Sequence, residues 1–293
     1  MNPLEAMLAQ YENNNKPKYE KSENSKTYDL KNYFNTFIKE GVKTGTKTIR
    51  ILPTSNGTSP FVEMHGHKVQ VDGEWKTFAC LKHERKEACP FCEAREALLA
   101  TGKDSDKELA KKYNAKLMYV VKVIDREKEE EGVKFWRFNH DYRKEGIYDK
   151  IHGVINAIKK DVTNAQTGRD LVITINRNQN NVPVVSAVAS LDASPLSDNE
   201  TQSNEWLADN RTWEDVYAIK TYDFLEIIVK GGTPVWDKDE KKYIDKASQK
   251  ASEVNDLDSE LTMGIETVKA SVKSATVVES KPSTEESEDD MPF

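Results

Sequence analysis

Short segments in which apolar and polar residues alternate dominate the first two thirds of the chain, and this pattern is typical of strands with one buried face. Strands are predicted over 46–52, 61–71, 75–79, 117–124, 133–138, 171–176 and 182–189. Asp72-Gly73, between the second and third of these segments, favours a two-residue hairpin turn. The pattern therefore predicts a strand-rich domain that contains a hairpin around residue 72.

Two segments have apolar residues at helical spacing. The first begins at Pro90, which suits the first turn of a helix, and ends near Gly102. The second spans 147–160, whereas the pattern over 213–230 fits either a helix or a strand. Short strands with inserted helices predict an α+β fold and suit a five-stranded oligonucleotide-binding (OB) barrel.

Composition divides the chain into three parts. Hydrophobic residues make up 37% and charged residues 32% of the 293 residues, so part of the chain cannot belong to a core. Residues 255–293 hold ten Asp or Glu and three Lys, a net charge of −7 that equals the charge of the whole chain. We expect an N-terminal arm over 1–27, a folded core over 28–246 and a disordered acidic tail over 247–293.

The sequence also bears on the compartment. It has no run of about 18 apolar residues and no basic-then-apolar signal at its start, so we expect neither a membrane span nor secretion. Its three cysteines lie close together, and this clustering suits a metal site in a reducing cytoplasm better than a disulfide framework.

All three cysteines and three of the five histidines lie within residues 65–92. Cys89 and Cys92 have the two-residue gap that lets neighbouring sulfurs reach one ion, and Cys80 lies nine residues upstream of Cys89. Thiolate and imidazole are the ligands that Zn²⁺ prefers. The spacing therefore predicts one structural zinc ion in a subdomain over about 60–102.

The histidine ligand has three candidates. Alternation along the strand places His65 and His67 on one face. If the two-residue turn sets the register, His65 lies directly opposite Cys80 and His67 lies on its diagonal. His83 forms a compact pair with Cys80 through a two-residue gap. Spacing alone leaves all three histidines open.

Basic and aromatic residues are interleaved in two segments that follow the predicted zinc subdomain. Proteins that bind single strands need this mixture, because phosphates attract Lys or Arg while unpaired bases stack on aromatic rings. Rings that alternate along a strand are also common in cores, and half of these are expected to face inward. The candidate DNA contacts are Lys111, Lys112, Tyr113, Lys116, Tyr119, Lys122, Trp136, Arg137, Phe138, Tyr142, Arg143 and Lys144.

The zinc segment, Pro60-Phe61…His67…Asp72-Gly-Glu-Trp75…Cys80…Cys89-Pro-Phe-Cys92, resembles the single-stranded-DNA-binding proteins of T-even bacteriophages. In that family one histidine on a hairpin and three cysteines hold zinc. The family's histidine stands five residues before the hairpin turn and thirteen before the first cysteine. His67 meets both spacings, so the resemblance implies that His67, Cys80, Cys89 and Cys92 bind the ion.

Further matches at Val120-Val-Lys122, Trp136-Arg-Phe138 and Ile147-Tyr-Asp-Lys-Ile151 extend the resemblance over about residues 28–230, with gaps. It implies an OB-fold topology with an inserted zinc subdomain, and it assigns Trp136, Arg137 and Phe138 as DNA contacts or their supports. The implied function is stoichiometric, sequence-tolerant binding of single-stranded DNA in replication, recombination and repair. A phage protein of this kind acts in the cytoplasm of the host bacterium and is not an enzyme.

Both ends of the chain carry features of partner binding. Asp289, Asp290, Met291, Pro292 and Phe293 resemble the C-terminal tip of bacterial single-stranded-DNA-binding proteins, which implies recruitment of replication, recombination and repair proteins. The phage family also self-associates along DNA through a basic N-terminal element. Its counterpart here is only diffuse and does not predict strong cooperativity: Lys16, Lys18, Lys21 and Lys26.

Two other functions compete with DNA binding. Cys89-Pro-Phe-Cys92 at a helix start is a pattern of thiol-disulfide oxidoreductases, in which a thiolate of low pKa reacts. That interpretation leaves Cys80 unexplained. A zinc-bearing RNA-binding module is the second alternative, since RNA offers the same phosphates and bases.

Overall fold

The computed structural model describes residues 29–71 and 73–247. Its strands are β1 (Thr44–Ile51), β2 (Val62–Val71), β3 (Glu74–Ala79), β4 (Ala115–Asp125), β5 (Val133–Asn139), β6 (Arg169–Arg177), β7 (Pro183–Ala193), β8 (Pro234–Asp237) and β9 (Lys242–Asp245). Its helices are η1 (Leu30–Asn32), α2 (Leu81–Glu84), α3 (Pro90–Ala100), α4 (Asp104–Lys112), η2 (Glu129–Glu131), α5 (Ile147–Ile158), α6 (Glu200–Leu207), α7 (Trp213–Val216) and α8 (Tyr222–Val229). The predicted strand-rich α+β class is confirmed.

Seven strands form one antiparallel sheet in the order β3-β2-β4-β1-β6-β7, with β5 paired to β4. β4 is the strand on which this sheet is centred. One of its edges pairs first with β2 and then with β1, and β5 occupies the opposite edge. β4 has 11 residues, so different parts of the strand can pack in different cores.

The main core lies between α5 and five strands, β1 and β4–β7. Leu171, Ile173 and Ile175 alternate along β6 and are fully buried, as the period-two pattern predicts for one face of a strand. Ile151 of α5 is also fully buried and packs in the same cluster. These five strands pair in the order β5-β4-β1-β6-β7 and share one core with α5, and among the described residues no pairing of β7 with β5 closes the predicted barrel. We call this part of the molecule the barrel, after the predicted fold.

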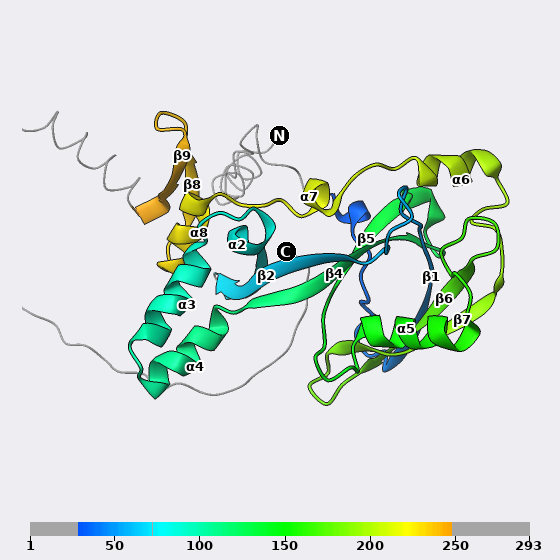
Figure 1. The fold of residues 1–293 in the computed structure, drawn as a ribbon, viewed down its shortest axis with the longest axis horizontal. Coiled ribbons are helices and arrows are strands. Elements are labelled where there is room, and N and C mark those ends of the chain that lie inside the picture. Colours follow the sequence, from blue (N-terminus) through cyan, green and yellow to red (C-terminus); the bar gives the residue numbers. More distant parts are fainter. Residues whose placement is uncertain (1–28, 72, 248–293) are drawn as a thin grey trace, which may run out of the picture.

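A second core forms the other end of the molecule. It combines the β2–β3 hairpin with α2, α3 and α8, and it contains all three cysteines. Figure 1 shows this end separated from the barrel, with β2, β4 and the segment around α7 running between the two. The segment around α7 covers the face of β4 and β5 that points away from the barrel core, where Trp213 and Val216 pack on Met118 and Phe135.

The ambiguous region over 213–230 is helical. Thr212 and Asp215 form a capping box that starts α7, and the chain then runs to α8, where Leu225 is fully buried in the second core. The sequence interpretation contained no counterpart for α4, α6 or the β8–β9 hairpin.

Some predictions fall outside the described residues: the N-terminal arm, nearly all of the acidic tail and its tip at 289–293. Over the ranges that the structure covers, no helix has the length and apolar character needed to cross a membrane.

Candidate metal centre and nucleic-acid interface

The hairpin and two helix starts bring the candidate metal ligands together. Val71 pairs with Glu74, so the loop is the predicted two-residue turn, and Gly73 has the positive φ of 84° that such a turn requires. At the far end of the hairpin the Cys80 N–H donates to the His65 carbonyl at 2.8 Å, in the predicted register. Cys80 then caps α2 and Cys89 caps α3, with Pro90 in the first turn.

One ligand atom from each of His67, Cys80, Cys89 and Cys92 lies within 4.8 Å of every other. The Sγ atom of Cys80 is 4.0 Å from that of Cys89 and 3.6 Å from that of Cys92. Nε2 of His67 is 3.4 Å from Cys89 Sγ and 3.8 Å from Cys92 Sγ. Four such ligands around a tetrahedral zinc ion stand roughly 3.5–3.8 Å apart, given a Zn–S bond near 2.3 Å. The donor set and its spacing fit a bound metal ion.

The surroundings of His67 orient its ring toward the sulfurs. The side chain is fully buried and packs on Phe91, with ring centroids 4.9 Å apart. Nδ1 lies 2.9 Å from the Tyr113 carbonyl, and a proton on Nδ1 that donates to this oxygen leaves Nε2 with its lone pair facing the cysteines. This arrangement is the usual one for a histidine that binds a metal.

In the absence of a cation, a negative charge on one cysteine disfavours ionisation of the other two. The hydrogen bond from Cys80 lowers the pKa of Cys89 to about 3, and the same contact together with burial raises the pKa of Cys80. Burial raises the pKa of Cys92 as well. A divalent ion offsets the charge of several thiolates in one buried space, so binding is expected to release protons.

The other two candidate histidines lie beside this group and outside it. His65 and His83 stack on each other with centroids 4.5 Å apart, and Nδ1 of His65 faces Glu84 Oε1 at 3.3 Å. Nδ1 of His83 is 3.1 Å from Cys80 Sγ, and burial lowers the pKa of His83. Both rings therefore border the Cys80 side of the centre.

Three of the candidate DNA contacts are buried. Trp136 and Phe138 are only 2% and 4% exposed, and Tyr119 is 6% exposed. Their side chains lie on the faces of β4 and β5 that point into the barrel core, and the segment around α7 covers the opposite faces. Of the two roles expected for Trp136 and Phe138, their burial favours that of supports over that of direct contacts.

Two predicted cations are already engaged inside the molecule. Lys122 donates to the Asp209 carbonyl at 2.6 Å, and the Arg137 guanidinium lies 4.7 Å from the centre of the Tyr217 ring. Both contacts join the sheet to the segment that precedes α8. These contacts stabilise the folded chain, and each cation would have to share or leave its internal partner to bind a phosphate.

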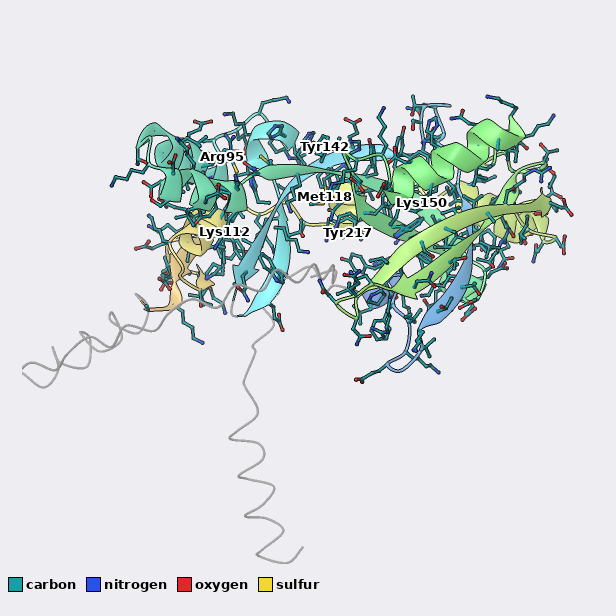
Figure 2. The ribbon with its side chains drawn as sticks, turned by 90° about the horizontal axis from the view of Figure 1, so that it is seen from below. Arg95, Lys112, Met118, Tyr142, Lys150 and Tyr217 are labelled. Atoms are coloured by element: carbon teal, nitrogen blue, oxygen red, sulfur yellow. The ribbon has the colours of Figure 1, made fainter. Side chains whose placement is uncertain are left out.

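The remaining candidates lie on or near the surface. Asp141 organises the turn after β5, since its side chain accepts from the Arg143 N–H at 2.8 Å and its carbonyl accepts from the Lys144 N–H. Tyr142 is consequently 79% exposed, and Arg143 and Lys144 are exposed beside it. Figure 2 shows Tyr142 at the middle of the molecule, between the end with Lys112 and the end with Lys150. Lys111, Lys112 and Lys116 are exposed and Tyr113 is half-buried.

A row of rings continues from Tyr142, and among its members only Tyr119 and Tyr142 were candidates from the sequence. The distances between neighbouring ring centroids are 4.5 Å for Tyr142 and His140, 5.7 Å for His140 and Tyr119, 4.3 Å for Tyr119 and Tyr148, and 5.2 Å for Tyr148 and Phe61. We call these five rings the aromatic row. Its members are spread from residue 61 to 148, so no local sequence pattern joins them.

Fold and site together define an α+β protein with a buried Cys₃His group that can hold a metal ion. The chain matches the family model described as gp32 DNA binding protein like over residues 43–224, well over half its length, and it belongs to that family of DNA-binding proteins. This match confirms the resemblance seen in the zinc segment and the central strands. No curated protein matches the chain significantly.

Proposed function

We propose that this protein binds single-stranded DNA without strong sequence preference and acts stoichiometrically in phage DNA replication, recombination and repair in the host cytoplasm. The observation that carries the proposal is that the region matched by a DNA-binding family exposes the ring of Tyr142 directly before the exposed cations Arg143 and Lys144. Rings for bases and cations for phosphates are the two requirements of a single-strand surface.

The proposed contact surface, which we call the central surface, consists of exposed residues from the turn after β5 and from the end of α4 and the start of β4. Its members are Lys111, Lys112, Lys116, Tyr142, Arg143 and Lys144. Tyr142 supplies a ring that is mostly exposed, and Figure 2 shows it on the stretch of the molecule between Lys112 of α4 and Lys150 of α5. Tyr119 and Trp136 hold the strands beneath this surface.

In this proposal the metal is one structural zinc ion held by His67, Cys80, Cys89 and Cys92. All four protein ligands are accounted for, so no open position is left for a substrate and the ion stabilises the fold. Protein partners are proposed to bind the acidic tail and its tip at 289–293.

The competing thiol-enzyme function has less support. Cys89 and Cys92 are 1% and 9% exposed and lie against a third thiol and a histidine, whereas a redox cysteine must be reached by its substrate. The matched family is also one of DNA-binding proteins. RNA binding is tested directly by titration with RNA beside DNA.

The test is an anisotropy titration of labelled single-stranded DNA, duplex DNA and RNA at several salt concentrations. Changing Arg143 and Lys144 together to Ala is expected to reduce the salt slope by roughly 1.4 units, about 0.7 for each phosphate contact. Tyr142→Ala is expected to weaken binding by roughly ten-fold with little change of slope, since stacking contributes about 1–3 kcal/mol.

Lys128→Ala is the matched control, because this exposed lysine lies in the loop between β4 and β5 and pairs only with Glu131 at the surface. Wild-type affinity and slope in all the central-surface variants show that the surface is elsewhere. Equal affinity for single-stranded DNA and RNA favours the RNA-binding alternative.

A further inference from the structure

A cavity lies at one end of the aromatic row. It has a volume of about 390 Å³, within the range of roughly 300–1,000 Å³ that small-molecule sites occupy. Three segments line it: the loop between β1 and β2, one side of α5, and the loop between α5 and β6. Thr54, Phe61, Tyr148, His152 and Asp161 are among its lining residues.

The apolar wall of the cavity is held in place from behind. Phe61 meets Tyr148 edge to face at 5.2 Å, and Tyr148 stacks on the buried Tyr119 at 4.3 Å with an interplanar angle of 13°. Phe61 and Tyr148 are each half-buried, so each ring keeps part of its surface open. The wall therefore offers an ordered aromatic surface to a flat ligand.

The polar groups at the cavity include a donor and an acceptor. The Asn156 amide lies 3.3 Å from Nδ1 of His152, and an amide N–H that donates there leaves the ring proton on Nε2. The Asp161 carboxylate accepts from the N–H and the hydroxyl of Thr163 through Oδ1, both at 2.8 Å. A ligand that carries both N–H donors and ring-nitrogen or carbonyl acceptors matches this pair.

The charges within the cavity disfavour phosphate as its occupant. Among the residues that line it there is no Lys or Arg, and Asp161 carries a negative charge. Exposed cations stand outside the cavity near both ends of the aromatic row: Lys159 and Lys160 precede Asp161, and Arg143 and Lys144 follow Tyr142. A strand whose phosphates lie on these cations would bring its bases toward the rings.

We propose that this cavity receives one nucleobase of the bound strand, turned out of the stack of its neighbours, with Phe61 and Tyr148 against its face and His152 and Asp161 at its edge. The inference rests on the proposed single-strand function and adds a defined place for one base. Every base has an aromatic face and an edge with donors and acceptors, so binding here is compatible with sequence tolerance.

The first experiment is photocrosslinking of the full chain to oligonucleotides that carry one 5-iododeoxyuridine at successive positions, followed by peptide mapping. Crosslinks at Phe61, Tyr148 or His152 from one position of the oligonucleotide support the proposal. Crosslinks confined to Tyr142 and to the second core of the β2–β3 hairpin, α2, α3 and α8, which we call the metal-binding lobe, overturn the cavity as a base site and leave the proposed function intact. Failure to bind single-stranded DNA at all refutes the proposed function itself.

The second experiment pairs protein and DNA changes. His152→Ala and Tyr148→Ala are expected to weaken binding roughly three-fold and ten-fold. An oligonucleotide with one abasic site at the crosslinking position should bind the wild-type protein and Lys128→Ala more weakly than the intact strand does. The same abasic site should weaken the binding of His152→Ala and Tyr148→Ala only slightly, because in these variants the contact between base and side chain is already lost. If the abasic site weakens binding equally in all four proteins, the base does not contact these side chains and the proposal is refuted. His152 is exposed, so its variant makes this test without disturbing the core.

Discussion

Removal of the metal is expected to unfold one lobe before the other. The three cysteines and His67 are part of the packed interior of the metal-binding lobe, where Cys80 and Cys89 are 0% and 1% exposed beside Phe91 and Leu225. Without an ion, three thiols and an imidazole crowd a space that water does not reach. The barrel has its own core around α5 and contains none of the ligands.

The size of the effect follows from ligand linkage. At a free zinc concentration 1,000 times the dissociation constant, binding stabilises the native state by about 4 kcal/mol. For a domain of this length 1 kcal/mol shifts the melting temperature by roughly 2–4 °C, so removing the metal is expected to lower it by roughly 8–16 °C. Hydrogen exchange should accelerate in α3, α8 and the β2–β3 hairpin, with β6 and β7 keeping most of their protection.

The assay combines chelation with Cys89→Ser, and it measures metal content, melting temperature and hydrogen exchange on the same samples. His65→Ala is the matched control, because His65 shares the face of β2 with His67 and lies outside the ligand group. We expect the control to keep its zinc. Zinc retained by His67→Ala and lost by His65→Ala, or exchange that accelerates equally in both lobes, is incompatible with this reasoning.

Two further predictions concern the segment around α7 and the tail. Arg137→Ala should lower the free energy of unfolding by about 0.5–2 kcal/mol through loss of its contact with the Tyr217 ring, measured by urea denaturation, and should leave the salt slope of DNA binding unchanged. Deleting 255–293 removes a net charge of −7 and should raise DNA affinity at low salt, whereas deleting only 291–293 should abolish partner recruitment in a pull-down and leave DNA affinity unchanged. Unfolding at wild-type urea concentrations contradicts the first, and partner binding that survives the short deletion contradicts the second.

The Cys₃His group was predictable because its determinants are local. A turn sequence sets the register of one hairpin, and the two-residue gap between Cys89 and Cys92 fits one helix start. The choice of His67 over His65 needed more than alternation, since both lie on the same face of β2. The difference in the structure is depth: His67 is fully buried beneath Phe91, and His65 stacks on His83 nearer the surface.

The proposed DNA surface was harder to predict, because alternation identifies the two faces of a strand without indicating what covers each face. β4 and β5 are covered on both: one face by the barrel core, the other by a segment around residue 213 that is about 75 residues distant from β5 in sequence. Trp136 therefore satisfies the pattern of a single-strand contact and is buried nonetheless. The cavity at Phe61 and Tyr148 likewise forms from three segments that only the folded chain brings together.

β4 physically joins the metal centre to the aromatic row. Just before the strand begins, the Tyr113 carbonyl faces Nδ1 of His67, and six residues later Tyr119 stacks on Tyr148. The stretch of β4 around Tyr119 is also held by β5, and the end of the strand by β1, neither of which contacts the metal ligands. Loss of the ion should thus loosen the start of β4 near Lys116 while leaving Tyr119 in place. Metal is therefore expected to matter more for stability than for base stacking, and the part of DNA affinity that depends on it should be the salt-dependent part supplied by the lysines of that lobe.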